Sequence, residues 1–380
     1  MPGKKQPGAV GADRDLRELA SRFELAGEFA SARPYGAGHI HETYRVRVGA
    51  GAHPGCILQR VNRRVFPDIP RLMENIVRVT AHMRRRLAAL PGSDPDREVL
   101  TVVPTRTGES SFLDDAGEYW RCFRFIEHRE LGERPGGPGQ AREAGRLFGR
   151  FLNLLADLPA PPLHETIPRF HDVDRRLDDF QQILAADPLQ RRAAAAAEVD
   201  LFGCRQDEMK STMARARAGG LPLRVTHNDT KFNNVLFDPR GRGVCVIDLD
   251  TVMPGFVLYD FGDAIRSAAS SAREDQADPA RVHFRMEIFR EFAAGYLDEL
   301  GGEIRAVESK HLAFSARLMT FIIGLRFLTD HLAGDAYFKA AKPGHNLQRA
   351  RAQLALLADM ERHFPEMEEI VSALSRKMRG

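Results

Sequence analysis

Cysteine is scarce in this sequence, and its placement excludes the common zinc and redox motifs. The 380 residues contain four cysteines, at positions 56, 122, 204 and 245. None lies in a C-x-x-C pair or at zinc-ligand spacing from a histidine. We therefore expect a cytoplasmic protein with reduced thiols.

Long apolar runs and a strong charge of one sign are also missing. The most apolar stretch, residues 318–328, is about ten residues long and contains Arg326, whereas a bilayer span needs roughly 20. Lys and Arg number 55 against 52 Asp and Glu, a net charge of +3, which does not indicate nucleic-acid binding. Residues 1–15 are rich in Gly, Pro and Lys, lack the apolar core of a signal peptide and are predicted to be a disordered tail. We expect no membrane or nucleic-acid partner and favour a monomer.

The spacing of apolar residues divides the remaining chain into two parts. Between residues 33 and 127 it predicts short strands at 43–48, 56–61, 100–103 and 120–126, and one helix over 69–90. A Gly/Pro-rich segment at 131–139 follows, and helical spacing dominates beyond it. The exception is a hairpin predicted at 235–237 and 244–249. The pattern predicts an α+β protein with a small antiparallel sheet lobe at 16–127 and a larger helical lobe at 128–380.

The stretch 226–249, THNDTKFNNVLFDPRGRGVCVIDL, carries the chemistry. His227, Asp229 and Asn234 have the spacing of the H-R-D-x-x-x-x-N catalytic loop of kinases, with Asn228 in place of the arginine. Phosphoryl transfer needs a carboxylate that orients the attacking hydroxyl and accepts its proton, and an oxygen ligand that holds Mg²⁺. Asp229 is the candidate base and Asn234 a candidate metal ligand.

A second metal carboxylate is expected at the end of the hairpin. Asp248 follows the strand that returns antiparallel to the one leaving Asn234, and Asp250 points to the same side as Asp248 if the backbone is extended. Lys231 is placed to neutralise charge on the transferred group. The literal Asp260-Phe261-Gly262 comes too late in the chain, so Asp260 is interpreted as a helix cap or a brace for the catalytic loop. A surface loop rich in Asn and Asp is the alternative for the whole stretch, but the conjunction of these motifs favours the kinase interpretation.

Seven segments resemble the N-acetylhexosamine 1-kinase family within the aminoglycoside phosphotransferase and choline kinase superfamily. They are YGAGHIHETY (35–44), ILQRVN (57–62), LMENIVRVTAHM (72–83), HNDTKFNNVLFD (227–238), VIDLDTVMPG (246–255), LYDFGDAIR (258–266) and GLRFLTDHLAGDAYF (324–338). The resemblance implies a two-lobed protein-kinase-like fold, ATP, Mg²⁺, and phosphorylation of the anomeric hydroxyl of GlcNAc or GalNAc.

The same resemblance implies residues that bind the sugar. Arg326 and Tyr337 match positions that bind the sugar in that family. His39 and Glu42 lie in the segment where the family usually has GHINDTY and this chain has GHIHETY. Helical spacing puts Arg326 on a buried stripe, where an ion pair with Asp330 is the alternative explanation. Tyr337 as a core aromatic is a second alternative.

The sequence indicates the nucleotide-binding residues less clearly than the catalytic ones. Gly36 and Gly38 occupy the place of a phosphate-covering loop, although a tight hairpin explains two glycines equally well. The strand lysine of kinases is missing: Gln59 takes its place, Arg60 is the nearest cation and Glu74 the candidate helix partner.

Residues 125–127 are the expected hinge that meets adenine, with Phe125 and Glu127 as contacts, or else a plain edge strand running into a linker. Two other functions stay open. One is a kinase for another small alcohol, such as a different sugar, an aminoglycoside or choline; retention of Arg326 disfavours a cationic aminoglycoside. The other is a catalytically inactive nucleotide-binding protein, suggested by the missing lysine and disfavoured by retention of Asp229, Asn234 and Asp248.

Overall fold

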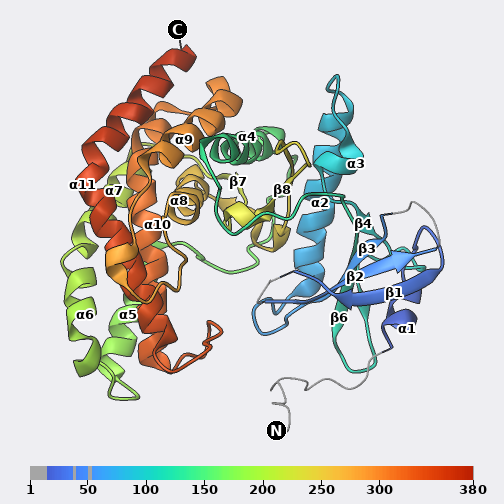
Figure 1. Cartoon of the computed structure of the whole chain (residues 1–380), viewed down its shortest axis with the longest axis horizontal. Coiled ribbons are helices and arrows are strands. Elements are labelled where there is room, and N and C mark those ends of the chain that lie inside the picture. Colours follow the sequence, from blue (N-terminus) through green and yellow to red (C-terminus); the bar gives the residue numbers. More distant parts are fainter. Residues whose placement is uncertain (1–14, 37–39, 50–53, 380) are drawn as a thin grey trace, which may run out of the picture. The chain divides into compact units, whose positions relative to one another are not determined.

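The computed structural model describes residues 15–36, 40–49 and 54–379, which form two compact units (Figure 1). The first contains the described residues up to Met73 and Thr101–Ile126, and the second contains Glu74–Leu100 and the chain from Glu127 onward. The cut falls inside α2 (Ile69–Ala88), so residues 74–100 group with the second unit although they lie within the predicted 16–127 lobe. The domain limits 16–127 and 128–380 stay a prediction.

A small antiparallel sheet makes up most of the first unit. Its strands are β1 (Phe29–Pro34), β2 (Glu42–Val48), β3 (Cys56–Arg60), β4 (Val102–Val103), β5 (Phe112–Leu113) and β6 (Tyr119–Arg124), in the order β1-β2-β3-β6-β4 with β5 also paired to β6. Buried side chains of β2, β3 and β6 pack against Phe23, which follows the short helix α1 (Leu16–Ser21). The core of this unit therefore lies on one face of the sheet.

Helices dominate the second unit. They are α3 (Pro95–Glu98), α4 (Pro138–Leu154), α5 (Val173–Ala186), α6 (Ala196–Gly203), α7 (Gln206–Ala218), α8 (Val257–Ala268), α9 (Met286–Leu300), α10 (Ala306–Ala333) and α11 (His345–Arg379), with short 3-10 turns η1 (Ala193–Ala195), η4 (Pro279–Arg281) and η5 (Gly301–Glu303). The small sheet and this larger helical unit confirm the α+β prediction.

Close backbone contact joins α4 to α9. A Cβ at Gly145 would lie 2.2 Å from the carbonyl oxygen of Phe292, and one at Gly295 would lie 2.1 Å from that of Arg142. Because any side chain at these two positions would force the helices apart, glycine is required at both.

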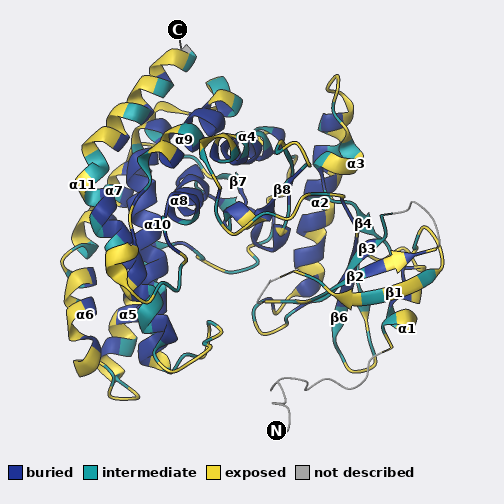
Figure 2. Cartoon of the chain, viewed as in Figure 1, coloured by how far each residue is buried: buried dark blue, intermediate teal, exposed yellow. Residues whose placement is uncertain are grey.

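Helix α10 is long and apolar. It has 28 residues and an 18-residue window of mean hydropathy 1.5, so by length and composition it is the one helix in the described part of the chain that could cross a membrane. However, 89% of that window is buried, by packing on α5, α8 and α11 (Figure 2). The core helix of a soluble protein passes the same test, so this helix is weak evidence for a membrane span.

Two short strand pairs frame the predicted catalytic loop. The expected hairpin is present as β8 (Val235–Phe237) and β9 (Gly243–Val246), although β9 ends three residues earlier than predicted. A second pair, β7 (Arg224–Thr226) with β10 (Met253–Gly255), was not predicted, because three-residue strands show no measurable alternation. The loop between β7 and β8 contains the 3-10 turn η2 (Phe232–Asn234), and η3 (Leu249–Thr251) follows β9.

Candidate active site

Three candidate catalytic side chains meet in the loop between β7 and β8. The Nζ of Lys231 lies 2.8 Å from Oδ1 of Asp229, and Nδ2 of Asn234 donates to the Asp229 carbonyl oxygen at 2.8 Å and to its Oδ2 at 3.1 Å. Burial alone would raise the pKa of Asp229, but the charge and hydrogen bond of Lys231 outweigh it and lower that pKa. Burial likewise opposes the charge of Lys231, yet the carboxylates of Asp229, Asp263 and Glu274 raise its pKa. At neutral pH, Asp229 is therefore ionised beside a cation.

Asp260, in the first turn of α8, braces this loop. Its Oδ2 accepts from the backbone N–H of His227 at 2.9 Å and its Oδ1 from that of Asn228 at 2.7 Å, while its carbonyl oxygen accepts from the Thr230 hydroxyl at 2.5 Å. The side chain is buried, and this burial raises its pKa to about 6 against the hydrogen bonds and charges that favour the carboxylate. The prediction that Asp260 supports the loop is confirmed.

The proposed metal ligands lie at adjacent ends of the β8–β9 hairpin. The backbone N–H of Ile247 donates to the carbonyl oxygen of Asn234 at 2.9 Å, so Asp248 follows directly after the residue paired with Asn234. Since Nδ2 of Asn234 points to Asp229, its Oδ1 is the amide atom left to bind a cation. Oxygen donors of this kind suit Mg²⁺. Within the described ranges, no group of three or more His, Cys, Asp and Glu side chains could hold a metal ion.

The argument from extended backbone that placed Asp250 beside Asp248 is wrong. Asp248 has left-handed backbone angles, φ 63° and ψ 61°, and the next three residues form η3. Asp250 is only 2% exposed, and its carbonyl oxygen accepts from the Thr166 hydroxyl at 2.9 Å. The alternation of a strand does not survive a left-handed residue followed by a 3-10 turn, so Asp250 as a metal ligand stays a prediction without this support.

Arg326 on α10 is surrounded by aromatic rings. Its Cζ lies 4.8 Å from the centroid of Phe170, 5.4 Å from that of Tyr337 and 5.2 Å from that of Phe338, a set that we call the aromatic clamp. Burial lowers the pKa of the guanidinium, opposed first by Tyr337, yet it remains a cation at neutral pH. No ion pair of Arg326 occurs within the described part of the chain.

Both alternative explanations, Tyr337 as a core aromatic and an ion pair of Arg326 with Asp330, are wrong. Tyr337 is 51% exposed, so it is not a core aromatic. Asp330 does not pair with Arg326, because its carboxylate accepts the backbone N–H groups of residues 336–338.

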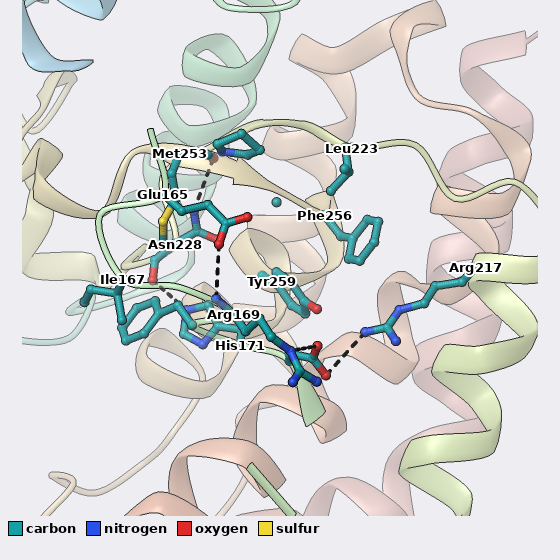
Figure 3. Close-up of a pocket in the computed structure, with 14 residues that line it drawn as sticks. Glu165, Ile167, Arg169, His171, Arg217, Leu223, Asn228, Met253, Phe256 and Tyr259 are labelled. Atoms are coloured by element: carbon teal, nitrogen blue, oxygen red, sulfur yellow. Dashed lines mark hydrogen bonds and ion pairs between the residues drawn. The ribbon is translucent and has the colours of Figure 1, made fainter. Parts of the chain in front are cut away.

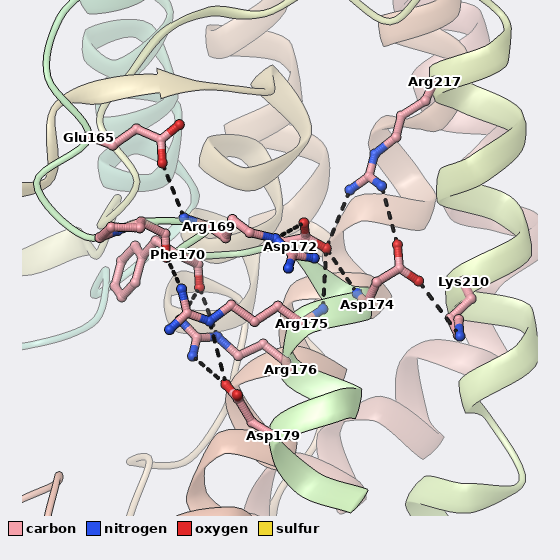
Figure 4. Close-up of polar contacts among 11 residues, drawn as sticks. Glu165, Arg169, Phe170, Asp172, Asp174, Arg175, Arg176, Asp179, Lys210 and Arg217 are labelled. Carbon is pink, nitrogen blue, oxygen red and sulfur yellow. Dashed lines mark hydrogen bonds and ion pairs between the residues drawn. The ribbon is translucent and has the colours of Figure 1, made fainter. Parts of the chain in front are cut away.

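Two residues that the sequence analysis did not identify hold the segment before α5. Arg176 donates from Nε and Nη2 to the carbonyl oxygen of Phe170, at 3.0 and 2.6 Å (Figure 4). His171 lies with its Nε2 2.8 Å from the carbonyl oxygen of Asn228, and burial lowers its pKa to about 3. His171 is therefore neutral, and the carbonyl partner requires the proton on Nε2. No spacing rule in the sequence pointed to either residue: Arg176 bonds backbone six residues before it, and His171 bonds backbone 57 residues after it.

A pocket of about 240 Å³ lies beside the catalytic loop, with Asn228, His171, Phe256 and Tyr259 among its lining residues (Figure 3). Neither Asp229 nor Arg326 lines it. The charged groups at its rim pair with one another, as Arg169 and Arg217 do with acidic residues at the start of α5 (Figure 4).

Among the candidate nucleotide residues of the first unit, Gln59 and Arg60 lie on β3 and Gly36 follows β1. Gly36 has φ +78°, whereas Gly38 and His39 fall outside the described residues. The amide of Gln59 donates to the Thr43 hydroxyl at 3.0 Å and accepts from Arg121 at 3.0 Å. Arg60 pairs with the carboxylate of Glu42, and this hydrogen bond raises its pKa; its second partner is Glu118, at 3.0 Å. The side chains of Gln59 and Arg60 thus already have partners within the first unit.

The remaining candidates have local partners in their own units. Glu74 lies 2.9 Å from Nε2 of His164 and 3.8 Å from Arg78. In the first unit, the backbone N–H of Phe125 donates to Gly55, and the Arg45 guanidinium lies 3.0 Å from the centroid of the Phe125 ring. In the second, the carbonyl oxygen of Glu127 accepts from Arg97 at 3.2 Å.

Comparison with known proteins identifies the class. A family model described as "Phosphotransferase enzyme family" matches residues 31–308, and the chain belongs to this family of phosphotransferases.

The fold is shared with solved small-molecule kinases. A microcompartment-associated aminopropanol kinase is 20% identical with a TM-score of 0.63, covering 93% of this chain and 97% of that one. An amicoumacin kinase solved with AMP-PNP and Ca²⁺ is 16% identical with a TM-score of 0.56 (89% and 91% covered), and choline kinase from Cryptosporidium parvum Iowa II is 14% identical with a TM-score of 0.52 (95% and 94% covered). At these identities the likeness is one of fold alone, and it confirms the expected kinase-like fold.

Proposed function

We propose that the protein is an ATP- and Mg²⁺-dependent kinase that phosphorylates the anomeric hydroxyl of an N-acetylhexosamine, GlcNAc or GalNAc. The observation that carries the reaction type is the Asp229 carboxylate held between Lys231 and Asn234 in a kinase-type loop. The observation that carries the substrate class is Arg326, a cation without a carboxylate partner among the described residues. Its guanidinium N–H groups favour a carbonyl or anionic group on the substrate.

In this proposal, Asp229 orients the sugar hydroxyl and accepts its proton as the new bond to phosphorus forms. Lys231 stabilises the negative charge that develops on the transferred group. Asn234 and Asp248, with Asp250 as a further candidate, hold Mg²⁺, which would neutralise the phosphate charge of the nucleotide. Asp229 keeps its proton-accepting form because its pKa is lowered.

The other predicted contacts are part of the same proposal. Arg326, Tyr337, His39 and Glu42 would contact the sugar, although Glu42 would have to do so while paired with Arg60. Residues proposed to contact the nucleotide are Gly36, Gly38, Gln59, Arg60, Glu74, Phe125 and Glu127.

Cationic acceptors fit the described residues poorly. An aromatic cage is the usual receptor for a quaternary ammonium such as choline. Here the aromatic clamp already encloses Arg326. A second cation at this position would meet the guanidinium charge, which disfavours choline and amino sugars with several free amines.

The test is Mg²⁺-dependent ADP release with GlcNAc, GalNAc, glucose, galactose, choline and kanamycin, with Asp229→Asn as the control. We expect turnover with the N-acetylated sugars, and a ³¹P spectrum should show phosphate on the anomeric oxygen. Turnover of choline or kanamycin alone would overturn the substrate class but keep the kinase chemistry. No turnover with any compound, together with nucleotide binding, would favour an inactive nucleotide-binding protein.

A further inference from the structure

Asp330 lies one helical turn after Arg326 on α10 and is 6% exposed. Its Oδ1 accepts from the backbone N–H groups of Ala336 at 3.0 Å and Tyr337 at 2.8 Å. Its Oδ2 accepts from the backbone N–H of Phe338 at 3.0 Å and from Nδ2 of Asn346 at 2.9 Å. Four donors therefore converge on one buried carboxylate, which matches the capacity of its two oxygens.

These bonds set the shape of the segment 335–338, which we call the 335–338 loop. Three consecutive backbone N–H groups point at one side chain, and the N–H of Asp335 donates to the Asp330 carbonyl oxygen at 2.8 Å. Asn346, fully buried on α11, also holds the start of the loop by donating to Oδ1 of Asp335 at 2.9 Å. Hydrogen bonds from backbone N–H groups to an ionised carboxylate are stronger than neutral ones.

The 335–338 loop carries two of the three rings of the aromatic clamp. Tyr337 and Phe338 both lie near the Arg326 guanidinium, and their rings contact each other with centroids 4.8 Å apart. Tyr337 is 51% exposed, so packing alone holds it weakly. Phe338 also packs on Phe327, with ring centroids 4.6 Å apart, so the backbone hydrogen bonds to Asp330 matter most for the position of Tyr337.

We propose that Asp330 is a positioning residue that preforms the 335–338 loop, so that Tyr337 and Phe338 hold Arg326 in the orientation that binds the substrate. The inference rests on the proposed function, in which Arg326 contacts the phosphoryl acceptor. Asp330 itself touches neither substrate nor nucleotide. It acts by removing conformational freedom that the loop would otherwise lose on binding.

The chemistry requires a carboxylate rather than an amide. Asparagine at this position has one oxygen, and its NH₂ group would face two of the four donors that now converge there. Two hydrogen bonds would be lost and two donors left buried without acceptors, which releases the loop without changing the size of the side chain.

The experiment compares wild type with Asp330→Asn in two measurements. For turnover we expect the KM for the sugar to rise about tenfold, with kcat and the KM for ATP within about threefold of wild type. For hydrogen exchange of the full-length protein without substrate, we expect the amides of residues 336–338 to exchange at least about tenfold faster. Asn346→Ala removes one anchor and should produce smaller changes of the same kind.

The matched control is Asp359→Asn on α11. Asp359 is 4% exposed and also accepts a backbone N–H, that of Phe284 at 2.6 Å. It makes no contact with the 335–338 loop among the described residues, so its substitution should lower the melting temperature without raising the sugar KM or the exchange of 336–338.

The outcomes separate this inference from the proposed function. Unchanged exchange at 336–338 in Asp330→Asn would overturn the inference whatever the substrate is. Faster exchange with an unchanged sugar KM would show a purely structural role and also overturn it. If wild type turns over none of the sugars while exchange responds as expected, the proposed substrate fails and the preforming of the loop by Asp330 stands.

Discussion

The catalytic loop and the 335–338 loop are held by the same kind of hydrogen-bond arrangement but differ in how far they are buried. Each is held by one buried aspartate whose carboxylate accepts consecutive backbone N–H groups, Asp260 in the first case and Asp330 in the second. His227 is fully buried, whereas Tyr337 is 51% exposed. The catalytic loop is thus anchored in the core at His227, although the side chains of Asp229 and Lys231 are partly exposed. The loop that contacts Arg326 lies at the surface, where side chains can change without disturbing the core.

The two loops also differ in the partner of the cation next to each of them. In the catalytic loop the cation of Lys231 is paired with the proposed base, Asp229, at 2.8 Å. Next to the 335–338 loop, Arg326 has aromatic rings as neighbours and its nearest aspartate on α10 is used by backbone N–H groups. The first arrangement keeps the proposed base ionised by lowering its pKa, and the second leaves hydrogen-bond donors of Arg326 available for a ligand.

The largest effect is expected from Asp229→Asn. Removing a positioned general base typically costs 10²–10⁴ in rate, so kcat should fall by about 10³-fold while nucleotide affinity stays close to wild type. Steady-state kinetics and nucleotide titration measure the two quantities. A kcat within tenfold of wild type would contradict the assignment of Asp229 as the base.

Asp260→Asn should affect the catalytic loop and leave the 335–338 loop unchanged. One of the two carboxylate oxygens becomes an NH₂ group that faces a buried backbone donor, which should lower the free energy of unfolding by about 1–3 kcal/mol. We expect kcat to fall about tenfold, because Asp229 directly follows the braced residues, with the sugar KM little changed. A raised sugar KM with normal kcat would show that the two loops are not independent.

The pH dependence of stability is a sharper test of the Asp260 brace. Its pKa is raised from 3.8 to about 6, so between these values the folded state binds more protons than the unfolded state. Its contribution to stability is therefore greatest at low pH and is lost as the pH rises through about 6. Relative to Asp260→Asn, the free energy of unfolding of wild type should increase by on the order of 1 kcal/mol from pH 7.5 to pH 5. Denaturant titrations of both proteins would measure it; a constant difference contradicts the raised pKa.

The smallest expected effect concerns the third ring of the aromatic clamp. Arg176→Met removes both donors to the Phe170 carbonyl oxygen and should raise the sugar KM about threefold, with kcat unchanged. Its neighbour Arg175, which donates to Pro168 instead, supplies the control Arg175→Met (Figure 4). Equal effects of the two substitutions would indicate a general charge effect rather than placement of Phe170.

Much of the fold was readable from local patterns. Alternation along β2, β3 and β6 and the helical spacing of α2 predicted those elements close to their observed bounds. β1 was missed because its residues, FASARP, contain no alternating large apolar side chains and are mostly exposed. Asp248 was assigned an extended backbone because nothing in its neighbours signals a left-handed residue.

The sequence by itself marked the proposed reacting group, Asp229, and its immediate partners. Asp229, Lys231 and Asn234 lie within six consecutive residues, so their spacing and one short 3-10 turn are enough to bring them together. It also marked Arg326, although it offered Asp330 as the partner of that cation.

Tertiary structure alone decided what surrounds Arg326 and what holds the loops. Phe170 comes from a segment far in the chain from Tyr337 and Phe338, and the rings meet because α5 and α11 pack against α10. Whether an aspartate binds a nearby cation or backbone N–H groups depends on which donors packing brings to its oxygens, and Asp330 received four donors from the loop and α11. Local spacing cannot specify contacts of this kind, because their geometry is set by the helices that the whole core holds in place.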